Sequence, residues 1–235
     1  MATFVFIHGG FHGGWCWHKV TARLEAQGHR AIAPDMAGHG IDPTPRYTVT
    51  MDLIVSRLCE LIDGIDGPVA LIGHSLGGAV MSNVAERRAE KIERLYYVTA
   101  FLLANGDSTH GTLQRRKKGG TQSGLSDDGA QLLPSLDSVR DLFYHLCSDD
   151  DVALAKMLLV PENAVVALGP VSVTPERWGK IPRYFVECTQ DKAIPPELQR
   201  KMHVEMGCTR YWEIPADHSP FFSLPDALVE ILLTR

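Results

Sequence analysis

A serine between two glycines is the group in this chain whose chemistry is easiest to infer. Ser75 lies in GHSLG, between an apolar stretch that ends at Gly73 and a run of small helix-forming residues after Gly77. Glycines at these positions let the backbone turn sharply from a strand into a helix, which presents the hydroxyl at the sheet edge where α/β folds bind ligands. The alternative is a glycine-rich turn in which the serine is incidental. The motif therefore needs support from other residues.

A nucleophilic serine needs a base, and the base needs an acid that fixes its tautomer. Asp191 follows the fifth apparent strand and His218 follows the sixth, so both belong at the same sheet edge as Ser75. Asp217 is the competing acid, but adjacent side chains rarely meet in hydrogen-bonding geometry. We therefore predict Ser75 as the nucleophile, His218 as the general base and Asp191 as the orienting acid, in a chain order typical of serine hydrolases.

Backbone amides near the serine are candidates for stabilising a negatively charged intermediate. The amide of Leu76 opens the helix after the serine, where N–H groups are free to donate. A glycine-rich loop, residues 7–14, follows the first strand, and the amide of Gly10 or Phe11 is the second candidate donor. This loop fits neither a dinucleotide fingerprint nor a P-loop, so we expect no nucleotide cofactor.

Six short apolar segments alternate with amphipathic segments that have helical spacing. The predicted strands are residues 3–7, 30–34, 69–73, 94–101, 183–188 and 210–214. The predicted helices are residues 15–28, 50–65, 76–90, 196–206 and 224–233. Several strands are apolar at consecutive positions, as expected for parallel strands covered on both faces. We predict an α/β fold with a six-stranded, mainly parallel sheet flanked by helices.

The alternation of strands and helices breaks between residues 104 and 180. This stretch begins with a polar, Gly/Ser-rich segment and continues with helix-like pieces at 138–147 and 150–160. We predict a core formed by residues 1–103 and 181–235, and a mostly helical cap, or lid, formed by residues 104–180. Phe143 and Trp178 are candidates for a substrate pocket under this cap, although such apolar residues can equally form the cap's own core.

Composition argues against several other classes of function. The 235-residue chain has a formal net charge of −5, which gives no reason to expect nucleic acid or an anionic membrane as a partner. We interpret the basic run at 115–118 as a solvated loop. Because no signal peptide or membrane-spanning run is evident, we expect a cytoplasmic protein. His8 and His12 have metal-ligand spacing but lie in the glycine loop without carboxylates, and the five cysteines are far apart, so we expect neither a metal site nor disulfides.

Taken together, these segments resemble the α/β-hydrolase superfamily over nearly the whole chain. FVFIHGGFHGG, GHRAIAPDMAGHG, LIGHSLGG, TPERWGKIPRYFVECTQDKAIP and PADHSPFFSLP are similar to one branch in particular. That branch holds plant methyl-ester esterases, plant hydroxynitrile lyases and bacterial esterases. The resemblance implies an α/β-hydrolase fold with a mostly helical cap and supports the roles given to Ser75, Asp191 and His218.

The resemblance also implies which residues surround the reacting carbonyl. It assigns the two oxyanion amides to Gly10 and Leu76, and it places Phe11 and His74 in the wall of the pocket. It implies no cofactor.

Two positions argue against lyase activity within this branch. Hydroxynitrile lyases have a lysine directly after the catalytic histidine and a threonine after the histidine of the first strand, whereas this chain has Ser219 and Gly9. The resemblance therefore implies a carboxylesterase that cleaves a small-molecule ester or carbamate, with a methyl ester as the expected substrate. A receptor-like binding protein with little turnover is the alternative. The sequence leaves open whether an amide is accepted and whether the chain forms a homodimer.

Overall fold

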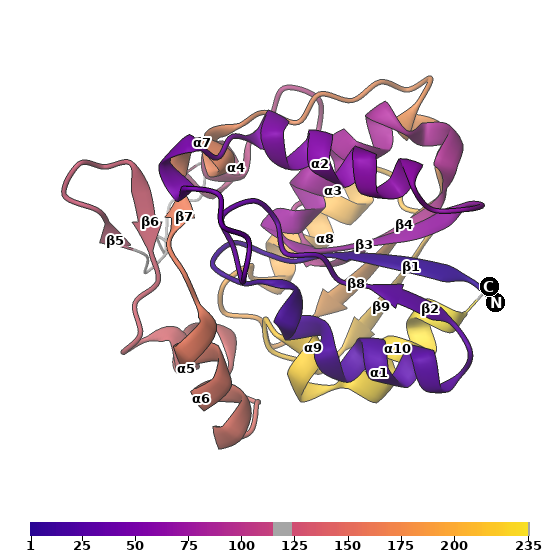
Figure 1. The fold of residues 1–235 in the computed structure, drawn as a ribbon. Coiled ribbons are helices and arrows are strands. Elements are labelled where there is room, and N and C mark those ends of the chain that lie inside the picture. Colours follow the sequence, from indigo (N-terminus) through magenta and orange to yellow (C-terminus); the bar gives the residue numbers. More distant parts are fainter. Residues whose placement is uncertain (115–123, 235) are drawn as a thin grey trace.

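The six predicted strands form one parallel sheet. The computed structural model describes residues 1–114 and 124–234, so the basic run at 115–118 lies outside the described residues (Figure 1). In sheet order the strands are β2 (Arg30–Ile32), β1 (Thr3–Ile7), β3 (Val69–Ser75), β4 (Ile92–Ala100), β8 (Arg183–Cys188) and β9 (Arg210–Ile214). Every neighbouring pair is parallel, so the carboxyl ends of all six strands meet at one edge.

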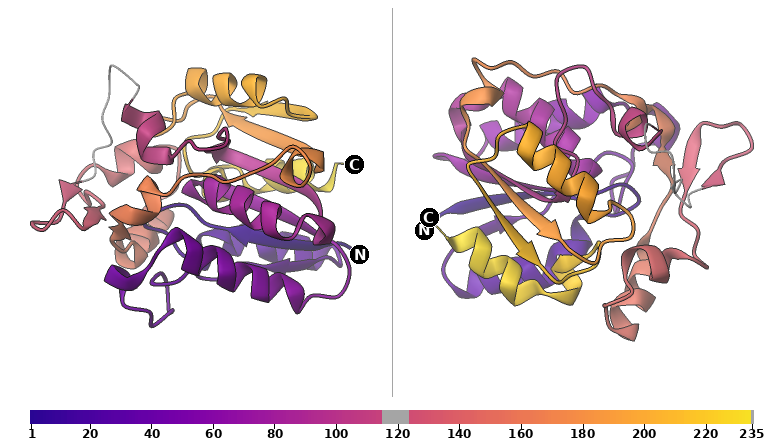
Figure 2. Two further views of the ribbon diagram at one scale, coloured as in Figure 1. Left: turned by 90° about the horizontal axis from the view of Figure 1, so that it is seen from above. Right: turned by 180° about the vertical axis from the view of Figure 1, so that it is seen from behind.

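Helices cover both faces of this sheet (Figures 1 and 2). One face carries α1 (His18–Ala26), α9 (Pro220–Ser223) and α10 (Pro225–Leu233), and the other carries α2 (Met51–Asp63), α3 (Leu76–Arg87) and α8 (Pro196–Glu205). Single 3-10 turns lie at Gly14–Trp17, Arg46–Thr48, Ala89–Lys91 and Trp178–Lys180. Phe4 and Phe6 of β1 pack into the first layer, whereas Val5 and Ile7 pack into the second. Burial on both sides explains why the strands are apolar at consecutive positions.

The inserted segment lies at the edge where the strands end, opposite both termini (Figure 1). It contains the helices α4 (Thr109–Gln114), α5 (Val139–Phe143), α6 (Asp149–Leu158) and α7 (Ala164–Leu168). It also contains an antiparallel sheet of β5 (Gly124–Leu125), β6 (Gln131–Leu133) and β7 (Glu162–Asn163), which the sequence analysis did not predict. Strands this short cannot show the period-two alternation by which a strand is recognised.

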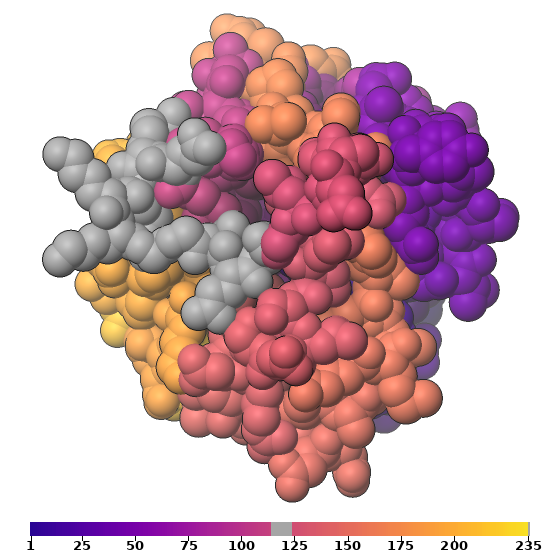
Figure 3. Space-filling view, turned by 90° about the vertical axis from the view of Figure 1, so that its left-hand side faces the viewer, coloured from indigo at the N-terminus to yellow at the C-terminus, as the bar shows by residue number. Residues whose placement is uncertain are grey.

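Polar contacts join the cap to the core, and cap residues occupy much of this end of the molecule (Figure 3). The amide of Val160 donates to the carbonyl oxygen of Phe11 at 2.9 Å. Lys19 on α1 forms an ion pair with Asp151 on α6, with 2.6 Å between Nζ and Oδ1. Within the described part of the chain, no helix combines the length and apolar character needed to cross a membrane.

Candidate active site

Ser75 lies in the sharp strand-to-helix turn that the sequence predicts. It ends β3, α3 begins at Leu76, and its backbone has φ 50° and ψ −123°, which non-glycine residues rarely adopt. Such strain costs about 1–3 kcal/mol and persists only where the surroundings enforce it. Here the turn packs closely against itself and the sheet. A Cβ added to Gly73 would lie 2.8 Å from the carbonyl oxygen of Gly77, and one added to Gly77 would lie 2.4 Å from that of Ile7.

His218 and Asp191 meet at the same edge of the sheet. They follow β9 and β8, both are buried, and His218 Nδ1 lies 2.6 Å from Asp191 Oδ2. The amides of Ala193 and Ile194 donate to Asp191 Oδ1 at 2.7 and 2.9 Å, and the Thr99 hydroxyl donates to Oδ2. These donors hold the carboxylate in one orientation. Because the carboxylate accepts from Nδ1, the proton of a neutral His218 is on Nδ1 and its Nε2 is available as a base.

Asp217, the competing acid, has different partners. Its Oδ2 accepts from the amide of Leu146 in the cap at 2.9 Å. Its Oδ1 accepts from the amide of Ser219 at 3.1 Å and from the hydroxyl of Ser223 at 2.9 Å. The geometry therefore agrees with the preference for Asp191, and Asp217 serves to hold the cap against the loop that carries His218.

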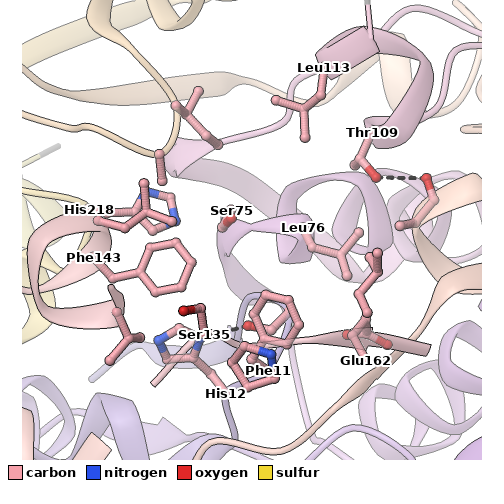
Figure 4. A pocket seen from close by; sticks show the side chains of 18 of the residues that line it. Phe11, His12, Ser75, Leu76, Thr109, Leu113, Ser135, Phe143, Glu162 and His218 are labelled. Carbon is pink, nitrogen blue, oxygen red and sulfur yellow. Dashed lines mark hydrogen bonds between the residues drawn. The ribbon is translucent and has the colours of Figure 1, made fainter. Parts of the chain in front are cut away.

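Ser75 and His218 line the same cavity, which lies between the core and the cap (Figure 4). Its volume is about 420 Å³, within the range of small-molecule sites. The predicted residues Gly10, Phe11, Leu76 and Phe143 also line it. Apolar side chains form much of the remaining wall: Leu113, Leu125, Leu132, Pro134, Leu142 and Ile194.

His12 supports the loop that contains the predicted oxyanion donor. Burial lowers the pKa of His12 to about 3, so its ring is neutral at ordinary pH. Its Nδ1 donates to the carbonyl oxygen of Gly10 at 2.7 Å, which leaves Nε2 to accept from the Tyr144 hydroxyl at 2.6 Å. Phe11 next to it has a positive φ of 69°. The sequence analysis missed this role because a histidine in a glycine loop does not reveal its partners.

Two of the predicted substrate-binding residues lie elsewhere. His74 is buried behind the site, where its Nε2 donates to the carbonyl oxygen of His218 at 2.8 Å. Trp178 packs in the core on the α2, α3 and α8 face and donates to the hydroxyl of Tyr97 at 3.0 Å. Neither is among the described residues that line the cavity. The resemblance places His74 in the pocket wall, and Trp178 is a candidate as an apolar residue of the cap, but neither argument determines which way a ring points.

Charged residues in the cavity wall were also missed. Glu162, on β7, lines the cavity, and so does Lys192, which forms an ion pair with Asp141. Lys192 could have been predicted because it directly follows Asp191 in the sequence. Glu162 could not, because it belongs to a strand without a recognisable sequence pattern. In the described ranges, no cluster of three or more His, Cys, Asp or Glu side chains has an arrangement suited to a metal ion.

Comparison with known proteins places this architecture in a family. The model of the alpha/beta hydrolase family matches residues 4–231. The chain belongs to this family. The chain is 32% identical over 247 residues to Methylesterase 1 of Arabidopsis thaliana, an alignment that covers 98% of the chain and 94% of the relative.

Solved structures of an esterase and of a pyrethroid hydrolase are similar over nearly the full length of the chain. The crystal structure of polyneuridine aldehyde esterase has a TM-score of 0.90 and 28% identity, with 99% of this chain and 98% of that chain covered. A pyrethroid hydrolase from Sphingobium faniae JZ-2 has a TM-score of 0.88 and 26% identity, with 98% and 95% covered. The chain thus belongs to the branch that holds plant methylesterases and bacterial pyrethroid hydrolase relatives.

Proposed function

We propose that this hydrolase is a serine esterase that cleaves small carboxylic or carbamic esters, with methyl esters preferred, through an acyl-enzyme. One observation carries the proposal. Ser75 is held in a strained turn and lines the same cavity as His218, whose Nδ1 is hydrogen-bonded to Asp191. Relatives that carry the names methylesterase and esterase support the reaction type.

In the proposed reaction His218 Nε2 takes the proton of Ser75 Oγ as this oxygen attacks the ester carbonyl. The amides of Gly10 and Leu76 donate to the oxyanion that forms on the carbonyl oxygen. His218 then passes its proton to the leaving alcohol oxygen, and the C–O bond to the alcohol breaks. Water, deprotonated by His218, attacks the acyl-enzyme, and His218 returns this proton to Ser75 Oγ as the bond from Oγ to the acyl carbon breaks and the acid is released. Asp191 stays ionised and keeps His218 in the useful tautomer.

The structure around Gly9 favours hydrolysis over lyase chemistry. A Cβ added at Gly9 would lie 2.8 Å from Nδ1 of His74 and 2.9 Å from Cβ of Ser75. A threonine at this position, as in hydroxynitrile lyases, therefore does not fit this backbone. Ser219 follows His218 and carries no cation for a leaving cyanide.

The role of the cap, the class of substrate and the cellular location are proposed from the sequence. We propose that residues 104–180 act as the cap that selects the substrate, and that the partner is a small-molecule ester or carbamate. The cytoplasmic location stays a prediction, and the homodimer stays an open question.

The proposal is tested by comparing the purified enzyme with its Ser75→Ala variant on a matched panel of substrates. The panel contains aliphatic and aromatic methyl esters, a heteroaryl methyl carbamate, a secondary amide and mandelonitrile. We expect hydrolysis of at least one ester and a loss of at least about 10³-fold in kcat in the variant. Ser56→Ala on α2, away from the cavity, is the control for serine removal. Near-normal hydrolysis by Ser75→Ala would contradict the proposal.

A further inference from the structure

Glu162 places a carboxylate in the wall of the cavity, at a position that the proposed reaction does not use. The residue is only 1% exposed. It lies beside the predicted oxyanion loop, because a Cβ added to Gly10 would be 3.5 Å from Glu162 Oε2. Figure 4 shows Glu162 close to Phe11 and on the opposite side of the view from His218. A substrate bound at Ser75 would therefore share the cavity with this carboxylate.

His39 balances the charge of Glu162. His39 Nε2 lies 3.2 Å from Glu162 Oε2, and His39 Nδ1 donates to the carbonyl oxygen of Ala37 at 3.2 Å. Since Nδ1 carries a proton, a neutral ring would point a lone pair at the carboxylate, so one proton must lie between the two groups. Burial alone would lower the pKa of His39, but Glu162 and the carbonyl of Ala37 together outweigh burial, and the pKa is raised. The pair is therefore neutral overall, so it does not repel a nearby oxyanion as a lone carboxylate would.

The carboxylate of Glu162 nevertheless has room for a further hydrogen-bond donor. Among the described residues Oε1 has no hydrogen-bond partner, and Oε2 has only the contact with His39 at 3.2 Å, which is outside ideal hydrogen-bonding geometry. A buried carboxylate elsewhere in the same chain is different. Glu187 is buried to a similar degree, but its two oxygens accept from Arg200 and His203. Because buried acceptors are almost always satisfied, a donor for Glu162 is missing at a wall of the substrate cavity.

We propose that Glu162 accepts a hydrogen bond from the substrate and so selects esters that carry a hydroxyl or N–H group within a few bonds of the carbonyl. This inference rests on the proposed esterase function and narrows its substrate class. A neutral donor fits better than a cation, because the Glu162–His39 pair is already neutral and a further buried charge would be uncompensated. The apolar wall, which includes Phe143, accepts the hydrocarbon part of the acyl group.

The test compares matched esters that differ only in a hydroxyl or a methyl group. Methyl 2-, 3- and 4-hydroxyphenylacetate are paired with the corresponding methylphenylacetates, and kcat/KM is measured for the enzyme and for Glu162→Met. We expect the enzyme to prefer the hydroxyl ester in at least one pair. We expect Glu162→Met to reduce that preference by about 10- to 100-fold, the range for a hydrogen bond to a charged group. Glu162→Gln, which keeps an oxygen acceptor without charge, should reduce it less.

Controls separate this inference from general effects on folding. Glu187→Gln disturbs a buried Glu–His pair away from the cavity, so it should lower the unfolding temperature without changing the hydroxyl-to-methyl ratio. Circular dichroism checks that each Glu162 variant is folded, and if Glu162→Met is not, Glu162→Gln is decisive. The inference is overturned if the ratio of kcat/KM for the hydroxyl ester to that for the methyl ester is the same in the enzyme and in the folded Glu162 variants. It is also overturned if the enzyme itself does not prefer any hydroxyl ester.

Failure of the proposed function gives a different result. Hydrolysis that persists in Ser75→Ala contradicts the proposed function and leaves the ratio readable. If no ester is turned over, calorimetric affinities of the same pairs for Ser75→Ala and Ser75→Ala/Glu162→Met decide the inference. The inference is supported if Ser75→Ala binds the hydroxyl ester more tightly than the methyl ester and the double variant does not. It is overturned if the two esters bind equally to both variants.

Discussion

Ser75 combines a reactive position with an unfavourable backbone conformation. Its φ of 50° and ψ of −123° lie outside the regions that an alanine or serine prefers, whereas glycine adopts them without strain. We therefore expect Ser75→Gly to have a higher free energy of unfolding than Ser75→Ala, by about 1 kcal/mol. Urea denaturation of the two variants measures this difference. Equal stabilities would mean that the turn stores no strain at this residue.

Asp191 and Asp217 are both buried, but the structure gives them different tasks. Asn in place of Asp191 can no longer hold His218 in the correct tautomer, so we expect Asp191→Asn to reduce kcat by about 10⁴-fold. Asp217→Asn puts an amide N–H against a donor, so it should lower the free energy of unfolding by about 1–3 kcal/mol. Steady-state kinetics, corrected for the folded fraction, distinguishes the two effects. The opposite assignment would follow if Asp217→Asn lost the larger part of kcat.

The sequence predicts where a residue lies in space when its position along the chain determines that place. Ser75, Asp191 and His218 follow strands of one parallel sheet, and such strands all end at one edge. It failed for His74 and Trp178, because their positions do not determine the direction of the ring. Glu162 gave no signal at all, since its burial depends on how the cap folds over the core.

At the scale of elements, the close approach of α3 to β1 positions the reactive turn. A Cβ on Gly77 would lie 2.4 Å from the carbonyl oxygen of Ile7 and 2.6 Å from that of His8. Gly77→Ala must therefore push the helix away from the strand. We expect it to lower the free energy of unfolding by about 1–3 kcal/mol and to reduce kcat.

Gly64 offers a matched control for this substitution. It caps α2 at a φ of −77°, and the nearest atom to an added Cβ there is 3.5 Å away. Gly64→Ala should change the midpoint of thermal unfolding little. An equal effect of the two substitutions would show that packing between α3 and β1 is not the cause.

The core strands could be predicted from the sequence, whereas the short strands of the cap could not. The six core strands have apolar runs, and their alternation with amphipathic helices predicts a largely parallel α/β sheet. The cap sheet of β5, β6 and β7 pairs segments of two or three residues. β5 and β6 form a short hairpin in which Leu125 lies opposite Leu132, whereas β7 pairs with β6 from far along the chain, with Asn163 opposite Gln131. Segments this short show no alternation that would predict them.

For the whole molecule, the docking of the cap on the core depends in part on Asp151. Burial would raise the pKa of Asp151, but Lys19 and Ser148 outweigh burial and the pKa is lowered. This carboxylate therefore contributes stability above the ordinary aspartate pKa of about 4, and the contribution is lost as the pH falls through the lower value of the folded state. Asp151→Asn should reduce the free energy of unfolding by about 1–2 kcal/mol at pH 7, and the difference should shrink below about pH 4. Denaturation at several pH values tests this, and a difference that is independent of pH would contradict it.

Covalent labelling tests the proposal that Ser75 is the nucleophile. A fluorophosphonate is incubated with the protein, and intact and tandem mass spectrometry locate the adduct. We expect one phosphonate per chain, on Ser75 Oγ, with no adduct in the folded Ser75→Ala variant. An enzyme that hydrolyses esters but is not labelled, or is labelled on another residue, would contradict it.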